Sequence, residues 1–215
     1  MYKTIIFDLD GTLLDTLDDL TDATNAALRE KGFPLRTKEE VRAFVGDGIR
    51  KLIERALDGR MDEVEETLEI FKRYYAAHCA DKTKPYDGVL ELLMELKKRG
   101  IQTAVLSNKA DFAVKKLAIE YFNGLLLAAV GEEEKAGVRK KPTPDGLLAL
   151  VKELNAEKDS TLYVGDSEVD ILTAKNAGMD CLCVTWGFRD KAVLRVYGAE
   201  RFVDTAEEIL SYVAE

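Results

Sequence analysis

The chain has 215 residues, of which 47% are hydrophobic and 33% are charged, and its formal net charge is −9 with a pI near 4.9. These values fit one large domain, or a domain with an insertion. They make a nucleic-acid partner unexpected, because proteins that bind nucleic acids carry basic surfaces. No apolar run approaches the roughly 20 residues that span a bilayer, and the N-terminus lacks the pattern of a signal peptide. We expect a cytoplasmic protein without a membrane partner, either a monomer or a homodimer.

The chain opens with a short apolar strand that ends in two acids. In the segment "TIIFDLDGTLLDT", the strand-favouring residues 4–7 are followed directly by Asp8, Leu9 and Asp10. Side chains alternate along a strand, so Leu9 should point away from the face that Asp8 and Asp10 share. Buried carboxylates are costly unless they are paired or bound to a metal, which makes this pair a candidate site.

Residues from about 16 to 80 have helical periodicity without an intervening strand. Thr37 and Glu40 have the spacing of a capping box at the start of one of these helices. Two apolar stripes predict a helical core; their members are Leu17, Leu20, Ala27 and Leu28, with Thr24 among them, and Val64, Leu68, Phe71 and Tyr75. We expect residues 16–82 to form an all-α subdomain inserted into a core of residues 1–15 and 83–215.

From residue 84 onward, helices and strands alternate. Helices are expected at 84–100, 110–122, 143–154 and 168–178 and near the C-terminus, and strands at 101–108, 125–131, 160–166, 180–187 and 201–204. This alternation is typical of a parallel sheet with helices on both faces. The predicted fold is therefore α/β, a doubly wound Rossmann-like parallel sheet with an inserted all-α subdomain after its first strand.

Polar residues follow the predicted strands at the sheet edge where ligands bind in such folds. They are Asp8 and Asp10, Ser107 and Asn108, Asp166 with Asp170 one helical turn later, and Lys141 before a helix. Taken singly, Asp10 could be a turn residue, Ser107, Asn108 and Asp166 could cap helices, and Lys141 could be solvated. Acids at two strand ends of one sheet repel each other, however, and a divalent cation removes that repulsion. Carboxylates of Asp8 and Asp166, with a main-chain carbonyl and waters, suit Mg²⁺.

Four segments also carry a family resemblance. "FDLDGTLLDT", "LSNK", "KKPTPD" and "VGDSEVD" occur in this order and resemble the four motifs of the haloacid dehalogenase superfamily. The match covers the whole predicted core, and the inserted helices resemble the C1-type cap of that superfamily. Within it the chain is most similar to phosphoglycolate phosphatases, in "FVGDGIRKLIERAL" of the cap and in "VTWGFR" after the fifth core strand.

The resemblance implies a Mg²⁺-dependent phosphomonoester hydrolase that acts on a small phosphorylated metabolite through an aspartyl-phosphate. Asp8 would be the nucleophile and Asp10 the general acid and base. The implied catalytic set is Asp8, Asp10, Ser107 and Lys141; the substrate-binding set is Gly11, Thr12, Ser107, Asn108, Lys141 and Arg50; and the metal set is Asp8, Asp10, Asp166 and Asp170.

These motifs constrain the type of reaction more tightly than they constrain the substrate. Our first expectation is 2-phosphoglycolate, with the Gly46-Asp47-Gly48 turn entering the site and Arg50 contacting the anion. An ordinary interhelical turn with a solvated Arg50 is the alternative at this position. Sugar-phosphate phosphatase, pyrophosphatase and β-phosphoglucomutase-like phosphomutase activities stay open.

Other readings of the four motifs are weaker. A dehalogenase is disfavoured because Asp10 is present. A phospho-aspartate signalling module resembling response-regulator receivers is opposed by the acid pair and by the inserted helices. An inactive binding relative is opposed because every motif position is filled.

Overall fold

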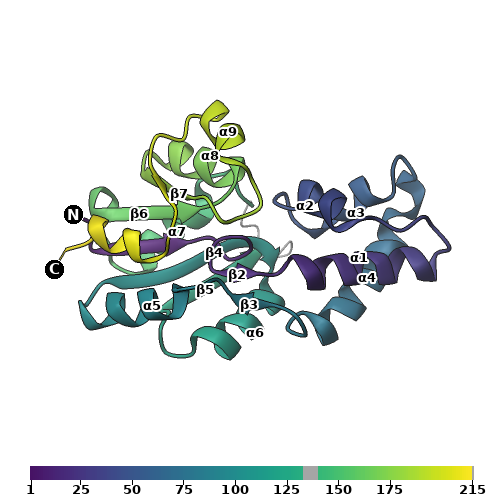
Figure 1. Ribbon diagram of the computed structural model, residues 1–215, viewed down its shortest axis with the longest axis horizontal. Helices are drawn as coiled ribbons and strands as arrows, with labels where there is room; N and C mark the ends of the chain where they lie inside the picture. Colours follow the sequence, from purple (N-terminus) through teal and green to yellow (C-terminus); the bar gives the residue numbers. More distant parts are fainter. Residues whose placement is uncertain (133–139, 215) are drawn as a thin grey trace.

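A six-stranded parallel sheet forms the core of the computed structural model, which describes residues 1–132 and 140–214 (Figure 1). The strands are β1 (Thr4–Phe7), β4 (Gln102–Ala110), β5 (Ala128–Glu132), β6 (Thr161–Gly165), β7 (Asp180–Val184) and β8 (Phe202–Val203). Their order in the sheet is β5-β4-β1-β6-β7-β8, and every neighbouring pair is parallel. The carboxyl ends of β4, β1 and β6 therefore lie next to one another at one edge.

Alternation along β1 sends its side chains into two apolar layers. Ile5 and Phe7 belong to the larger core, whereas Ile6 packs into a second cluster on the opposite face. The first face is covered by α5 (Val89–Lys98), α6 (Asp111–Phe122) and the 3-10 helix η3 (Glu207–Tyr212), and the second by α7 (Asp145–Glu153) and α8 (Glu168–Ala177). The short helix α9 (Lys191–Val196) packs onto α8. The expected doubly wound α/β fold is confirmed.

Four α-helices between β1 and the rest of the core extend to one side of the sheet, on the right in Figure 1. They are α1 (Leu17–Glu30), α2 (Lys38–Phe44), α3 (Ile49–Ala56) and α4 (Val64–His78), with a 3-10 turn at Met61–Glu63. All residues of both predicted stripes are buried, and α1 packs against α4. The capping box is also present: Glu40 N donates to Thr37 Oγ1 at 3.2 Å, and Thr37 N donates to Glu40 Oε2 at 2.7 Å.

A two-stranded antiparallel sheet joins the chain segments that enter and leave these helices. It pairs β2 (Leu14–Asp15) with β3 (Lys84–Pro85), and sequence analysis did not predict it. The buried carboxylate of Asp19, in the first turn of α1, strengthens the junction by accepting hydrogen bonds from Lys82 N, Thr83 N and Thr83 Oγ1 at 2.8–3.1 Å. The entering and leaving segments are therefore held together.

Several predicted boundaries differ from the structure. The second core strand continues to Ala110, and β5 begins at Ala128 rather than at Leu125, because Leu125 N closes a turn onto Phe122 O. The last helix is a 3-10 helix. None of the described helices has the length and hydropathy needed to cross a membrane.

Candidate active site

The adjacent ends of β1, β4 and β6 form the floor of a pocket. Asp8 follows β1 and Asp166 follows β6. The register of β4 is irregular between Leu106 and Ala110, which frees the intervening side chains from the regular ladder, as bulges near active sites do. The pocket encloses about 550 Å³, partly open to solvent, and is lined by Asp8, Asp10, Leu20, Val45, Gly46, Gly48, Ile49, Leu52, Ser107, Asn108, Lys109, Lys141, Asp166, Ser167, Phe188 and Arg189.

Lys141 occupies the centre of the buried charges. Its Nζ lies 2.8 Å from Asp8 Oδ1, 2.7 Å from Asp170 Oδ1 and 3.0 Å from the hydroxyl of Tyr163. Burial by itself lowers the pKa of Lys141, but the Asp170 and Asp8 carboxylates outweigh it and hold the pKa well above its ordinary value. Lys141 is therefore a permanent cation next to the expected nucleophile. Tyr163, in the middle of β6, was not anticipated from sequence.

Three carboxylates gather beside this lysine. Oxygens of Asp8, Asp166 and Asp170 lie within 4.8 Å of one another, and all three residues are buried. Burial raises the pKa of Asp8 to about 7 and, with the neighbouring Asp170 and Asp8 charges, raises the pKa of Asp166 well above its ordinary value. The raised pKa values mean that the protein supplies too little positive charge to stabilise the ionised carboxylates of Asp8 and Asp166 in this buried position.

The donor set of this cluster fits a hard divalent cation. Asp8 Oδ1 is buried and accepts no hydrogen bond of acceptable geometry, although Lys141 lies close to it. Asp170, by contrast, accepts hydrogen bonds at both oxygens, from Lys141, Tyr163 and the N–H and hydroxyl of Ser167. Asp166 accepts one hydrogen bond at each oxygen, half as many as Asp170. Asp8 and Asp166 therefore keep more free acceptor positions, and are suited to bind Mg²⁺ directly with Asp170 behind them.

Two glycines allow the main chain to approach Asp166 closely. A Cβ at Gly11 would lie 2.3 Å from Asp166 Oδ2, and Gly11 has a φ of +83°. A Cβ at Gly187 would lie 2.3 Å from Asp166 Cβ. The carboxylate also accepts hydrogen bonds from Phe188 N at 2.6 Å and from Thr12 Oγ1 at 3.3 Å. These contacts fix its orientation.

Asp10 faces the pocket but belongs to a different polar cluster. Its Oδ1 accepts hydrogen bonds from Lys109 Nζ and from Thr16 Oγ1, both at 2.7 Å. The described three-carboxylate cluster does not contain Asp10. The sequence signal for Lys109 was its place in "LSNK", two residues after Ser107.

The turn between α2 and α3 covers the pocket. Asn108 Nδ2 donates to Gly46 O at 3.1 Å and to Lys141 O at 3.0 Å, while Lys140 Nζ donates to Asp47 O at 3.1 Å. Gly46 and Gly48 line the pocket, so the turn lies where sequence analysis expected it.

Arg189 and Arg42 form reciprocal contacts between the core and the inserted helices. Arg189 donates to Arg42 O at 2.9 Å and to Val45 O at 2.7 Å, and its Nε pairs with Glu168 at 2.9 Å. Arg42 Nε in turn donates to Phe188 O at 2.8 Å. Arg189 is the last residue of "VTWGFR", and this pattern by itself predicted no role for it.

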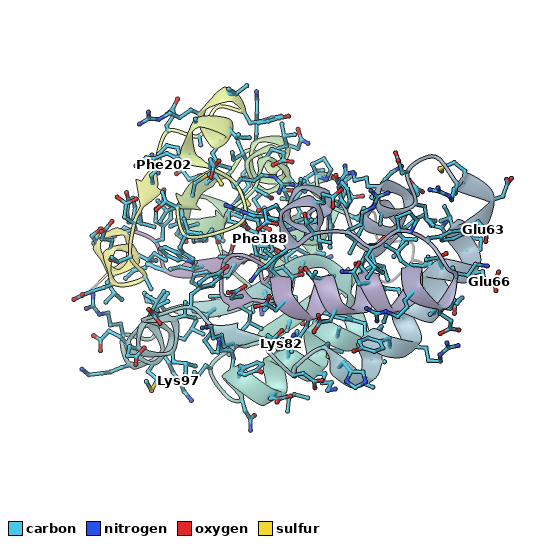
Figure 2. All side chains as sticks on the ribbon, turned by 45° about the vertical axis from the view of Figure 1, so that its right-hand side comes forward. Glu63, Glu66, Lys82, Lys97, Phe188 and Phe202 are labelled. Atoms are coloured by element: carbon cyan, nitrogen blue, oxygen red, sulfur yellow. The ribbon has the colours of Figure 1, made fainter. Side chains whose placement is uncertain are left out.

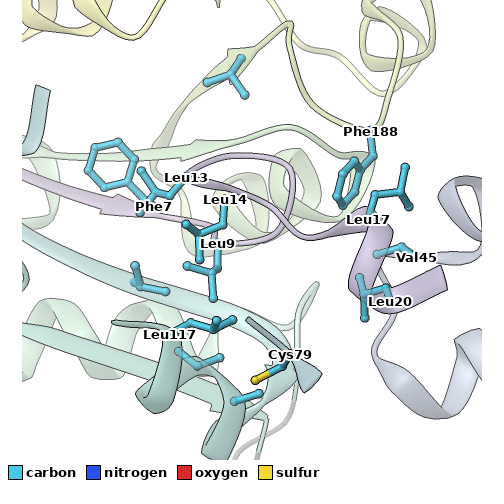
Figure 3. Packing of buried hydrophobic residues seen from close by; sticks show 14 of the residues in the cluster. Phe7, Leu9, Leu13, Leu14, Leu17, Leu20, Val45, Cys79, Leu117 and Phe188 are labelled. Atoms are coloured by element: carbon cyan, nitrogen blue, oxygen red, sulfur yellow. The ribbon is translucent and has the colours of Figure 1, made fainter. Parts of the chain in front are cut away.

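Apolar packing supports the same contact between core and insert. The Phe188 ring lies near Leu17, Leu20 and Val45 (Figure 3). Figure 2 places Phe188 at the junction, whereas Glu63 and Glu66 lie at the far end of the inserted helices.

Three residues of the expected substrate-binding set are placed differently from the expectation. Arg50 is not brought to the pocket: its guanidinium forms a two-point ion pair with Glu65 of α4, at 2.6 and 3.0 Å, and Arg50 is not among the described residues that line the pocket. The N–H of Gly11 donates to Leu14 O, and the Thr12 hydroxyl donates to Asp166. Ser107, Asn108 and Lys141 do line the pocket.

Comparison with known proteins agrees with this geometry. The family model of haloacid dehalogenase-like hydrolases matches residues 5–184. The chain belongs to the haloacid dehalogenase-like hydrolase family. A phosphoglycolate phosphatase from Pseudomonas syringae pv. syringae is 38% identical over 86% of this chain and 70% of its own. One from Vibrio parahaemolyticus is 34% identical over 99% of this chain and 96% of its own.

The same family is represented among solved structures. A candidate phosphoglycolate phosphatase from Lactobacillus delbrueckii subsp. bulgaricus superposes with a TM-score of 0.92 at 39% identity, covering 100% of this chain and 99% of the other. The expected resemblance to this superfamily, and to its phosphatases in particular, is confirmed.

Proposed function

We propose that the protein is a Mg²⁺-dependent phosphomonoester hydrolase that acts through an aspartyl-phosphate on a small anionic substrate, 2-phosphoglycolate being the first candidate. The observation that carries the proposal is the convergence of Asp8, Asp166 and Lys141 beneath a pocket that the α2–α3 turn covers. Relatives named phosphoglycolate phosphatase support the choice of substrate.

Asp8 is the proposed nucleophile. One of its carboxylate oxygens forms a bond to phosphorus as the bond between phosphorus and the leaving-group oxygen breaks, and Asp10 donates a proton to that oxygen. In the second step Asp10 takes a proton from water as the water oxygen bonds to phosphorus, and the Asp8–phosphorus bond breaks to release inorganic phosphate. Asp10 is then protonated again for the next cycle.

The remaining residues bind and orient the phosphoryl group. Lys141 and Ser107 both line the pocket. We expect the fixed positive charge of Lys141 and the hydroxyl of Ser107 to hold phosphoryl oxygens as charge develops. Asp8 and Asp166 would hold Mg²⁺, which when bound screens the negative nucleophile from the negative phosphate. Asn108 ties the α2–α3 turn to Lys141, so the covering turn and the phosphate site share one residue.

The walls of the pocket favour a small leaving group. The side that the inserted helices provide is made of glycines and aliphatic residues, namely Leu20, Val45, Gly46, Gly48, Ile49 and Leu52. These side chains offer no hydrogen-bonding groups to the several hydroxyls of a hexose. A short leaving group places fewer polar atoms against this surface than a hexose does, and unpaired buried polar groups are costly. The carboxylate of glycolate would have to face the cationic residues that line the rest of the pocket, Lys109, Lys141 and Arg189.

Turnover by the purified chain tests the proposal. Initial rates of phosphate release with Mg²⁺ should be measured for 2-phosphoglycolate, hexose phosphates, pyrophosphate and p-nitrophenyl phosphate, with wild type and with Asp8→Asn as the folded control. We expect the highest kcat/KM for 2-phosphoglycolate and no turnover by Asp8→Asn. A preference for hexose phosphates or pyrophosphate would contradict the assignment of 2-phosphoglycolate as the substrate. Isomerisation of β-glucose 1-phosphate would indicate a phosphomutase. Absence of turnover on all substrates would favour a binding or signalling module.

A further inference from the structure

Lys109 is a buried lysine that the proposed mechanism does not use. It contacts Asp10, the second of the two acids that follow β1. Lys109 is 3% exposed, and its Nζ lies 2.7 Å from Asp10 Oδ1. Lysine is rarely buried to this extent unless its charge is paired, so its position needs a reason. The irregular register at the end of β4 aims this side chain inward next to Ser107.

The hydrogen bonds around Asp10 select one of its two carboxylate oxygens. Thr16 Oγ1 donates to Oδ1 at 2.7 Å, the same oxygen that accepts from Lys109. Two donors on one oxygen restrict rotation of the carboxylate and leave Oδ2 for the leaving group. The side chain of Asp10 is 13% exposed and lines the pocket, so it can reach the substrate.

The helical insert helps to hold the lysine. Lys109 Nζ lies 4.8 Å from the centre of the Tyr75 ring, which α4 contributes and which is 1% exposed. An ammonium over an aromatic face is attracted to it, more strongly where water is excluded. Lys109 is therefore fixed between Asp10 on the core and Tyr75 on the insert.

We propose that Lys109 is a positioning residue that holds Asp10 Oδ1, so that Oδ2 transfers the proton to the leaving group and later accepts one from water. This inference rests on the proposed function, since it requires Asp10 to be the acid and base. The competing role is phosphate binding by Lys109 itself, which its place in the pocket also permits. The two roles predict different decreases in kcat/KM when Lys109 is replaced: a positioning role predicts a decrease that depends on the leaving group, and phosphate binding predicts an equal decrease on all substrates.

The test compares substrates with poor and good leaving groups. Lys109→Met keeps the bulk of the side chain and removes its charge. For 2-phosphoglycolate, an alkyl phosphate that needs protonation, we expect kcat/KM to fall roughly 10- to 150-fold, the loss of one charge-assisted hydrogen bond. For p-nitrophenyl phosphate, whose leaving group departs without a proton, kcat/KM should change little. Lys109→Arg should recover part of the loss on the alkyl phosphate.

A second readout follows from the role of Asp10 as base. With p-nitrophenyl phosphate, Lys109→Met should show a burst of nitrophenolate equal to the enzyme concentration, because hydrolysis of the aspartyl-phosphate becomes slow. Lys116→Met removes a lysine on the exposed side of α6, whose Nζ contacts Ala76 O, and serves as the matched control with unchanged kinetics on both substrates.

The outcomes separate this inference from the proposed function. Equal losses in kcat/KM on both substrates would assign Lys109 to phosphate binding, and unchanged kinetics on both would also overturn the inference. A wild-type chain without turnover would overturn the proposed function and this inference together. If Lys109→Met does not fold, Thr16→Val can replace it, because this substitution removes the other donor to Asp10 Oδ1. Thr16→Val should also lose more activity on the alkyl phosphate than on p-nitrophenyl phosphate. Equal losses on the two substrates would count against the proposal.

Discussion

The main-chain N–H of Phe188 donates a hydrogen bond to Asp166 Oδ2 at 2.6 Å. The carbonyl of Phe188 accepts from Arg42 of α2 at 2.8 Å, and the next residue, Arg189, donates back to Arg42 O and Val45 O. One short loop after β7 therefore contacts both the candidate metal site and the inserted helices. Closure of the insert and the arrangement of Asp166 should depend on each other.

Loss of Arg189 should weaken catalysis on all substrates alike. Arg189→Ala removes charge-assisted hydrogen bonds to Glu168 and two hydrogen bonds to carbonyls of the insert, so we expect kcat/KM to fall roughly 10-fold or more for both alkyl and aryl phosphates. Arg42→Ala should have a similar effect, and the double variant should lose less than the sum, because the two residues form one unit. Arg195→Ala, which among the described residues removes a contact with the Phe202 ring, is the control. Additive losses would show that the two arginines act independently.

Stabilisation by Mg²⁺ should increase with pH. The folded pKa of Asp8, about 7, lies above its ordinary value of 3.8, so the metal-free folded chain holds a proton that the unfolded chain has already released. The contribution of Asp8 to stability without metal therefore falls as pH rises from about 4 to about 7. Mg²⁺ needs the ionised carboxylate, and its binding releases that proton. We expect a larger rise in Tm on adding Mg²⁺ at pH 8 than at pH 6, measured by thermal unfolding. Asp166→Asn should abolish the rise; a rise of the same size at both pH values would contradict the assignment.

Replacement of Gly11 should damage the metal site beyond its backbone cost. In Gly11→Ala the added Cβ would lie 2.3 Å from Asp166 Oδ2, in addition to the strain of a φ of +83°. Gly59 has a similar φ, +88°, with no atom within 4 Å of the added Cβ, so Gly59→Ala measures the backbone cost alone, about 1–2 kcal/mol. We expect both variants to be destabilised but only Gly11→Ala to lose Mg²⁺-dependent stabilisation and turnover. Retention of both by Gly11→Ala would show that Asp166 can move without consequence.

The junction below the inserted helices should depend on Asp19. Asp19→Asn places an amide where three donors from Lys82 and Thr83 converge, so at least one buried N–H group faces another donor. We expect a loss of about 2–3 kcal/mol in the free energy of unfolding, or a Tm lower by roughly 4–10 °C. Asp22→Asn, on the same helix, breaks an exposed ion pair with Lys82 and should leave the Tm nearly unchanged. Equal effects of the two substitutions would exclude the buried hydrogen bonds as the cause.

The fold and the floor of the candidate site follow from patterns within the sequence. Strand and helix periodicities are local properties of the chain, and the alternation of elements after residue 84 requires a parallel sheet. The carboxyl ends of such strands meet at one edge, which is why Asp8, Ser107 and Asp166 could be placed together without coordinates. The capping box of Thr37 and Glu40 was predictable for the same reason, since both partners lie within one helical turn.

Which charged side chains reach the pocket depends on how the elements pack against each other. The sequence pattern favoured Arg50 and gave Arg189 no role, but α3 packs against α4 so that Arg50 pairs with Glu65, while the loop after β7 brings Arg189 to the α2–α3 turn. The contact of Lys109 with Asp10 joins residues 99 positions apart through an irregular strand end. Such contacts depend on the distance and orientation of elements packed against each other, which residue patterns within a single element do not encode.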